Sequence, residues 1–295
     1  MSQAPPAVLV ENLTKVFHTS FMRQKVAAVI DLSFHVGEGE VYGLIGPNGS
    51  GKSTTMKVIL GLIRATMGST AVFGVDSGKV GSRADVGFLP ENPYFYKHLS
   101  GRETLRFYGR LCGLSRQHLD ERIPELLKMV GLEKAAERQL SGYSKGMLQR
   151  IGLAQAVIHE PRLVVLDEPT AGVDPRGSRA IRDLVFQMKE SGKSVILCSH
   201  LLEQVQEVCD RVGIMSQGRM VREGTLEELT KVEGQEELIL EGANPELLGK
   251  IRNLIDEEKE ARLVRSGKPR TSLERLFLDA TDAQDAPEKT PLNPT

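Results

Sequence analysis

A glycine-rich loop contains the residue types best suited to binding phosphate. Residues 46–53 read Gly-Pro-Asn-Gly-Ser-Gly-Lys-Ser, follow the apolar run 41–45 and precede a helix-like stretch over 54–62. In the pattern G-x-x-x-x-G-K-S, the glycines let consecutive backbone N–H groups turn toward phosphate oxygens at the positive end of a helix. The alternative is a turn that only joins a strand to a helix. The order of strand, loop and helix favours nucleotide binding.

The residues of this loop have distinct expected roles. Lys52 is expected to reach the terminal phosphates, Ser53 to offer a hydroxyl to Mg²⁺, and Thr54 to donate to a phosphate nearer the sugar. The other loop residues expected to contact the nucleotide are Gly46, Asn48, Gly49, Ser50 and Gly51.

A second motif contributes two acids at the end of an apolar run. Residues 163–166 are followed by Asp167 and Glu168, as in a buried parallel strand that ends at a ligand. We expect Asp167 to hold Mg²⁺, usually through water, and Glu168 to polarise the attacking water from beside the metal. Alone, such a pair is typical of a solvated turn. Downstream of a phosphate-binding loop, it predicts nucleotide hydrolysis.

Composition limits the class of protein. The chain has 295 residues, 40% of them hydrophobic, which is enough for a large core. Its formal net charge of −1 gives no reason to expect nucleic acid or anionic lipid as a partner. The cysteines Cys112, Cys198 and Cys209 lack metal-ligand spacing, which fits a reducing compartment. Without a signal peptide or a run of about 18 apolar residues, we expect a cytoplasmic protein that meets a membrane only through a partner.

The hydrophobic pattern predicts an α/β protein with a β-rich start and a parallel core. A helical insertion is expected between about residues 91 and 160, with Ser100 and Ser115 as helix caps. Its third helix carries Met147, Ile151, Ala154 and Ile158 on one face. Strands are expected over 7–11, 29–36, 41–45, 69–73, 85–89, 163–167, 194–199 and 211–215, and further helices over 54–62, 103–111, 120–130, 176–190 and 201–208.

The pattern changes past Thr230. A strand-like stretch at 237–240, a helix-like stretch at 245–257 and a short apolar run at 273–278 predict a small α+β accessory domain over 231–281. Residues 282–295 have no apolar period, and their composition is typical of a disordered tail.

Further motifs make the chain resemble the ATP-binding cassette (ABC) family over residues 7–230. Residues 143–150, Tyr-Ser-Lys-Gly-Met-Leu-Gln-Arg, look like the family signature, usually Leu-Ser-Gly-Gly-Gln, which touches the γ-phosphate held by another subunit. The residues at the signature positions are Ser144, Lys145, Gly146 and Met147, of which Ser144 and Gly146 keep the common form and Lys145 and Met147 depart from it. Asp174 matches the family's dimer-facing loop, and His200 its switch histidine. The resemblance implies a P-loop NTPase fold, in which an N-terminal antiparallel β subdomain joins a core of mixed and parallel sheet. It also implies ATP and Mg²⁺ as cofactors and a head-to-tail dimer.

Two ring-bearing residues have competing interpretations. Phe17 lies where the family places an aromatic residue that stacks on adenine, but packing in the core beside Leu13 and Val16 is an alternative. A lone histidine at a strand end is more often structural than catalytic. The position of His200 after the strand 194–199 favours contact with the γ-phosphate.

Two of the departures from the family pattern, Glu91 and Lys145, each allow two interpretations. Glu91 stands where the family generally has a glutamine that senses Mg²⁺ and the attacking water at the junction with the helical insertion. Either Glu91 keeps this junction role and contributes to the metal site, or it faces solvent. Lys145 either approaches the partner's γ-phosphate or points to solvent, and we favour solvent because only small residues fit where backbone approaches phosphate.

The leading interpretation is an ATPase subunit that powers a membrane transporter. The resemblance implies a homodimer or a paired cassette subunit, separate integral membrane permease subunits, and a position on the inner face of the cell membrane. Likeness to the exporter-like (ABC-2 type) branch favours export. The insertion would be a partner surface, although Tyr94, Phe95 and Tyr96 are equally typical of core. The alternatives are a soluble cassette ATPase not coupled to transport and a weakly hydrolysing regulatory module.

Overall fold

The computed structural model describes residues 5–18, 25–200, 202–230, 240 and 242–257. The chain divides into two compact units, Met1–Thr230 and Lys231–Thr295. In the second unit, α8 (Pro245–Glu257) forms where a helix is expected. The strand predicted at 237–240, apart from Leu240, the apolar run 273–278 and the tail 282–295 lie outside the described residues. The boundaries of the accessory domain stay a prediction.

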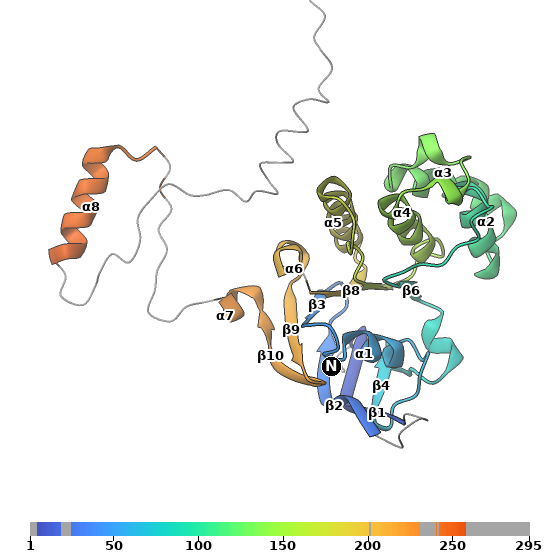
Figure 1. The fold of residues 1–295 in the computed structure, drawn as a ribbon, viewed down its shortest axis with the longest axis horizontal. Coiled ribbons are helices and arrows are strands. Elements are labelled where there is room, and N and C mark those ends of the chain that lie inside the picture. Colours follow the sequence, from blue (N-terminus) through green and yellow to red (C-terminus); the bar gives the residue numbers. More distant parts are fainter. Residues whose placement is uncertain (1–4, 19–24, 201, 231–239, 241, 258–295) are drawn as a thin grey trace, which may run out of the picture. The chain divides into compact units, whose positions relative to one another are not determined.

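A six-stranded sheet forms the centre of the first unit (Figure 1). Its strand order is β10 (Arg219–Thr225), β9 (Arg211–Ser216), β3 (Val41–Ile45), β8 (Ser194–Ser199), β7 (Leu163–Asp167) and β6 (Val86–Leu89). All neighbours pair in parallel except β10 with β9. The carboxyl ends of β3, β8, β7 and β6 therefore lie at one edge of the sheet.

A second, four-stranded sheet is antiparallel throughout. Its order is β2 (Lys25–Val36), β1 (Val8–His18), β4 (Met67–Val72) and β5 (Val75–Asp76). The helix α1 (Lys52–Ile59) packs with this sheet against one face of the central sheet, and the side chains between them form one hydrophobic core.

Helices cover the other face of the central sheet. They are α2 (Gly101–Leu111), α3 (Arg116–Met129), α4 (Lys145–Ala156), α5 (Pro175–Glu190) and α6 (Leu202–Val208), followed by the short α7 (Leu226–Thr230) after β10. Figure 1 shows α2, α3 and α4 grouped together, away from α1. Single 3₁₀ turns form at Val80–Arg83, Glu133–Ala135 and Leu140–Gly142.

The burial of β7 on both faces explains why its sequence is an uninterrupted apolar run. Leu163 and Val165 join the core shared with α1, while Val164 and Leu166 join the core shared with the helices. Because both faces of a parallel strand are covered, every residue of β7 is buried. The sheet thereby holds Asp167 at the end of a rigid element.

Several predicted element boundaries were wrong for identifiable reasons. α3 begins at Arg116 rather than residue 120, because Ser115 caps it by accepting a hydrogen bond from the His118 N–H at 3.2 Å. α2 begins at Gly101, where Ser100 and Glu103 form a capping box. Sheet pairing, which periodicity does not show, extends β1 to His18. The third helix of the insertion ends at Ala156, so Ile158 lies beyond it.

The strand β10 was not predicted. Gln217 and Gly218 both have positive φ, 48° and 80°, so β9 and β10 form a hairpin with a two-residue turn. The two-residue turn was the missed sequence signal.

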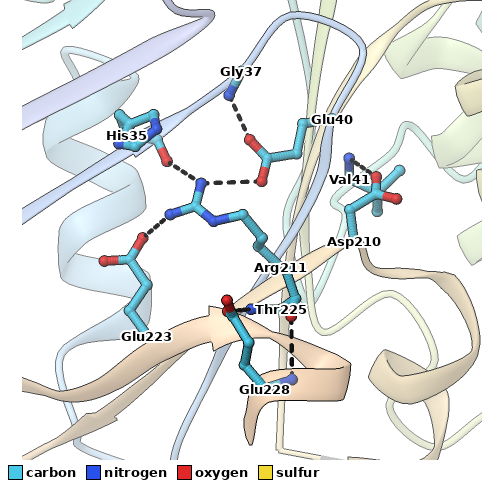
Figure 2. A network of polar contacts seen from close by, with 9 residues as sticks. All are labelled: His35, Gly37, Glu40, Val41, Asp210, Arg211, Glu223, Thr225 and Glu228. Atoms are coloured by element: carbon cyan, nitrogen blue, oxygen red, sulfur yellow. Dashed lines mark hydrogen bonds and ion pairs between the residues drawn. The ribbon is translucent and has the colours of Figure 1, made fainter.

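An ion-pair network fastens β9 and β10 to the start of β3 (Figure 2). The Arg211 guanidinium donates to Glu40 at 3.1 Å and to Glu223 at 2.6 Å, and lies 5.6 Å from the Tyr42 ring. Burial, with a further contribution from the charge of Glu223, raises the pKa of Tyr42. The two carboxylates are mostly buried and depend on Arg211 for charge compensation.

We predict that Arg211→Met lowers the free energy of unfolding by about 3 kcal/mol, because it leaves two largely buried carboxylates without their cation. Urea denaturation measures this loss. Arg222→Met, which removes an exposed arginine of the neighbouring strand β10, should change stability by less than about 0.5 kcal/mol. Equal effects of the two substitutions would show that the network is not required for stability.

Candidate functional site

The loop between β3 and α1 requires glycine at two positions. A Cβ on Gly46 would lie 2.2 Å from the Met215 carbonyl oxygen, and one on Gly51 would lie 2.5 Å from that of Ala28. Gly51 also has a φ of 106°, which side-chain-bearing residues rarely adopt. These contacts fold the loop tightly against neighbouring strands and leave its backbone accessible from the outer side.

Lys52 is directed back into this loop. Its side chain is nearly buried, and Nζ donates to the Gly46 carbonyl at 2.7 Å and lies 3.3 Å from that of Pro47. Nζ is also 3.9 Å from Glu168 Oε1. The ammonium therefore joins the loop to the two acids at the end of β7.

Asp167 lies at the carboxyl end of β7, opposite the start of α1. Its Oδ1 accepts a hydrogen bond of 3.2 Å from Ser53 Oγ. Burial is the main cause that raises the pKa of Asp167, and the charges of Glu168 and Glu91 add to it. A buried carboxylate with acidic neighbours favours a cation beside it.

Glu168 and His200 form a hydrogen-bonded pair. His200 Nδ1 lies 2.9 Å from Glu168 Oε2, and Glu168 is 7% exposed while His200 faces solvent. The backbone of Glu168 has a φ of 51°, and its N–H donates to the Cys198 carbonyl at 2.9 Å. The strain of a non-glycine residue in this region is typical of functional sites.

The oxygen atoms at this edge are suited to binding Mg²⁺ together with a phosphate group. Mg²⁺ prefers oxygen ligands, and Ser53 and Asp167 present a hydroxyl and a carboxylate side by side. Ser50 Oγ is buried and has no hydrogen-bond partner among the described residues. Its hydroxyl is available to a phosphate oxygen, because buried polar groups are normally satisfied. The remaining predicted contacts, Asn48, Gly49 and Thr54, belong to the same loop and the first turn of α1.

The predicted signature residues lie at the start of α4, away from the phosphate-binding loop. Ser144 caps α4 by accepting from the Met147 N–H at 3.3 Å, and Lys145 is exposed. A Cβ on Gly172 would lie 2.6 Å from Lys145 Nζ. The signature thus contacts the loop 171–174. Within the described part of the chain, no hydrogen bond or ion pair joins residues 46–53 to 144–147.

The loop after β7 carries Asp174, which caps α5 by accepting from the Gly177 N–H at 3.1 Å. A Cβ on Gly146 would lie 3.2 Å from Val173 Cγ1, so the starts of α4 and α5 are neighbours. Two helix N-termini, each with partial positive charge, therefore lie close together.

Phe17 and Glu91 are both exposed, and each has a defined contact. Phe17 is 40% exposed, so it is not packed in the core, and Lys15 Nζ lies 5.1 Å from its ring. Glu91 is exposed just beyond β6, yet its backbone carbonyl accepts from Gln149 Nε2 at 2.8 Å. The structure therefore brings Glu91 to the same sheet edge as Asp167 and His200. Sequence reasoning missed Gln149, whose only signal is a polar side chain on the buried side of a helix.

None of the described helices combines the length and apolar character needed to cross a bilayer.

Comparison with known proteins identifies the family. The family profile described as ABC transporter matches residues 29–171. An uncharacterized ABC transporter ATP-binding protein of Synechocystis is 38% identical over 291 residues, covering 90% of this chain and 82% of that protein. The chain belongs to the ABC transporter ATP-binding proteins. This ABC protein also resembles the linearmycin resistance ATP-binding protein LnrL of Bacillus subtilis, at 37% identity over 83% of this chain and 78% of that one.

Solved structures agree with this assignment. The ATP-binding subunit of an ABC transporter matches with a TM-score of 0.67 and 32% identity, over 76% of this chain and 91% of that chain. A cassette in a dimeric post-hydrolysis state bound to ADP and Pi matches with a TM-score of 0.68 and 25% identity, over 74% of this chain and 98% of that one. The family and the α/β P-loop NTPase fold expected from the sequence are confirmed.

We predict that Asp167→Asn stabilises the ligand-free protein. Because folding raises the pKa of this carboxyl, the unfolded chain loses the proton first as the pH rises. The free energy of unfolding therefore falls between the ordinary aspartate pKa and the raised value. Thermal unfolding at neutral pH should therefore show a higher melting temperature, by about 2–4 °C for each 1 kcal/mol of stability gained in a domain of this size. The difference should vanish below the ordinary aspartate pKa, where both side chains are neutral. A lower melting temperature for Asp167→Asn at neutral pH would contradict this.

Proposed function

We propose that this ABC protein hydrolyses ATP in a dimer of two copies and thereby powers export through separate membrane-embedded permease subunits. The observation that carries the proposal is the group formed by Lys52, Asp167, Glu168 and His200, which three adjacent parallel strands place at one sheet edge. This group contains a cation for phosphate, a carboxylate beside a hydroxyl, and a carboxylate paired with an imidazole.

Each residue then has a chemical task. Lys52 and the loop backbone bind the β- and γ-phosphates, and Ser53 and Asp167 would hold Mg²⁺, which when bound neutralises phosphate charge. Glu168 accepts a proton from the attacking water, and His200, hydrogen-bonded to Glu168, orients that carboxylate and reaches toward the γ-phosphate. Phe17, exposed near the end of β1, stacks on the adenine ring.

The second copy completes the site. The starts of α4 and α5 are neighbours, and their N–H groups can meet a γ-phosphate held by the partner. Ser144, Gly146 and Met147 would supply this contact, with Asp174 in the adjoining loop. The side chain of Lys145 lies along Gly172, which places its charge at the rim of this contact.

A groove beside β6 is suited to a permease helix. Its volume is about 600 Å³, and its lining includes Phe88, Tyr94, Phe95 and Tyr108. Tyr94 is 86% exposed while Phe95 is 7% exposed, so the aromatic run 94–96 contributes both surface and core. Phe107 packs on Tyr96 and Tyr108 and is itself partly exposed. The lining also includes the polar side chains of Arg83, Gln155 and His159, and a groove of mixed character suits an amphipathic helix.

Transport, rather than soluble ATPase activity or regulation, has independent support. The relatives are named as ABC transporter ATP-binding proteins, and one is named for linearmycin resistance, which expulsion of a compound would produce. Docking to a permease through the groove would hold the protein on the inner face of the membrane.

The first test uses Glu168→Gln. This substitution removes the proton acceptor but keeps the size of the side chain, so we expect ATP hydrolysis to fall by at least about 100-fold. ATP should still bind, and size-exclusion chromatography with Mg²⁺ and ATP should show a stable dimer. Glu190→Gln, at an exposed position of α5, is the matched control and should remain active. A Glu168→Gln protein that stays monomeric with ATP would refute the shared site.

The second test concerns the groove. Tyr94→Asp places a charge among the aromatic side chains where the apolar face of a helix would bind, so we expect co-purification of a membrane-embedded permease with the tagged chain to fall by about 10-fold or more. Val221→Asp, at an exposed position of β10, should leave co-purification unchanged. Equal recovery of the permease with both variants would exclude this groove as the docking site.

A further inference from the structure

The antiparallel sheet brings Phe17 close to the phosphate-binding loop. Val26 of β2 pairs with Phe17 of β1. Two residues further along β2, the carbonyl oxygen of Ala28 packs on Gly51 of the loop, where a Cβ would lie 2.5 Å away. Because a strand rises about 3.3 Å per residue, Phe17 lies about 7 Å along the sheet from this contact. A ribose can bridge that separation between a base on Phe17 and phosphates in the loop.

Lys15 covers one face of the Phe17 ring. The two residues are two positions apart on β1, so their side chains leave the strand on the same side. Lys15 Nζ lies over the ring at 5.1 Å from its centroid, within the range of a cation–π contact. The Phe17 side chain is still 40% exposed, so the ring face away from Lys15 is open to a base.

The ammonium of Lys15 is itself held in place. Its Nζ donates to the Arg64 carbonyl at 2.8 Å. The segment that carries Arg64 is tied to β1, because the Thr66 N–H donates to the Thr14 carbonyl at 2.8 Å and Thr66 Oγ1 accepts from the Val16 N–H at 3.0 Å. A lysine on a strand surface otherwise samples many rotamers, and this hydrogen bond restricts Lys15 to the position over the ring.

We propose that Lys15 is a positioning residue that holds the Phe17 ring in the orientation in which it stacks on adenine. This inference rests on the proposed function, because it takes Phe17 as the residue that binds the base. The base then meets a ring that is already oriented, so less conformational entropy is lost on binding. The alternative is that Lys15 only fastens β1 to the segment after α1.

Substitutions at Lys15 and Phe17 separate positioning from a purely structural role. The proteins are the parent, Lys15→Met, Phe17→Ala and the double variant, all as full-length chains. Binding of a non-hydrolysable ATP analogue with Mg²⁺ is measured by isothermal titration calorimetry, and binding of inorganic tripolyphosphate, which has no base, by competition. We expect Lys15→Met to weaken binding of the analogue by about 4-fold, the size of an exposed cation–π contact, and to change binding of tripolyphosphate by less than about 1.5-fold.

The double variant tests whether Lys15 acts through Phe17. If it does, adding Lys15→Met to Phe17→Ala should weaken binding of the analogue by less than about 1.5-fold more. Lys15→Arg, whose guanidinium also stacks on aromatic rings, should bind the analogue within about 2-fold of the parent. Lys15→Gln, which keeps a hydrogen-bond donor but carries no charge, should reproduce the loss if Lys15→Met folds poorly.

The proposal is overturned if Lys15→Met weakens binding of the analogue equally in both backgrounds, or has no effect in the parent. Equal weakening of analogue and tripolyphosphate binding would also overturn it, because the effect would then not involve the base. Lys57→Met, which removes an exposed lysine of α1, is the matched control for the loss of one positive charge and should bind both ligands as the parent does.

The same data distinguish this proposal from the proposed function. If the parent binds neither the analogue nor tripolyphosphate, the proposed function fails and the inference fails with it. If Phe17→Ala binds the analogue as tightly as the parent, the adenine contact of the proposed function fails, again with the inference. If Phe17→Ala weakens binding of the analogue and Lys15→Met does not, only the inference fails.

Discussion

The parallel pairing of β3, β8 and β7 is the constraint on which the candidate site depends. Ile45 pairs with Ser199, and Asp167 pairs with Cys198. This register places the phosphate-binding loop, His200 and the two acids at one edge, although they are far apart in the sequence. The sheet is buried on both faces, so the register is strongly specified. The charged side chains at its edge are held in place by elements that cannot shift independently.

This rigidity makes an electrostatically unfavourable site possible. Asp167 and Glu168 are adjacent, nearly buried carboxylates, and Lys52 is the cation close to them. Such a group destabilises the ligand-free fold, as the raised pKa of Asp167 indicates. A nucleotide with its metal would supply the missing charge compensation. The free energy of nucleotide binding and the conformational change that follows binding are then linked through Asp167, Glu168 and Lys52.

The sequence predicted the parts of this arrangement that depend on local chemistry. The phosphate-binding loop, the strand ending at Asp167 and the caps Ser100 and Ser115 all follow from short-range patterns. It did not predict β10, whose existence depends on pairing with β9, or the contact of Gln149 with Glu91, which depends on how α4 packs. Contacts between distant segments leave little trace in one sequence. The roles of the site residues stay predictions.

The measurement that tests the central claim most directly is a cross-link between two copies. In a Cys112→Ser background, which removes the exposed native cysteine, one chain carries Asn48→Cys and a differently tagged chain carries Lys145→Cys. If the loop of one copy faces the signature of the other, ATP should induce a disulfide between the two chains, and neither chain should cross-link with itself. ATP-dependent dimers without this cross-link would contradict a site shared between two copies.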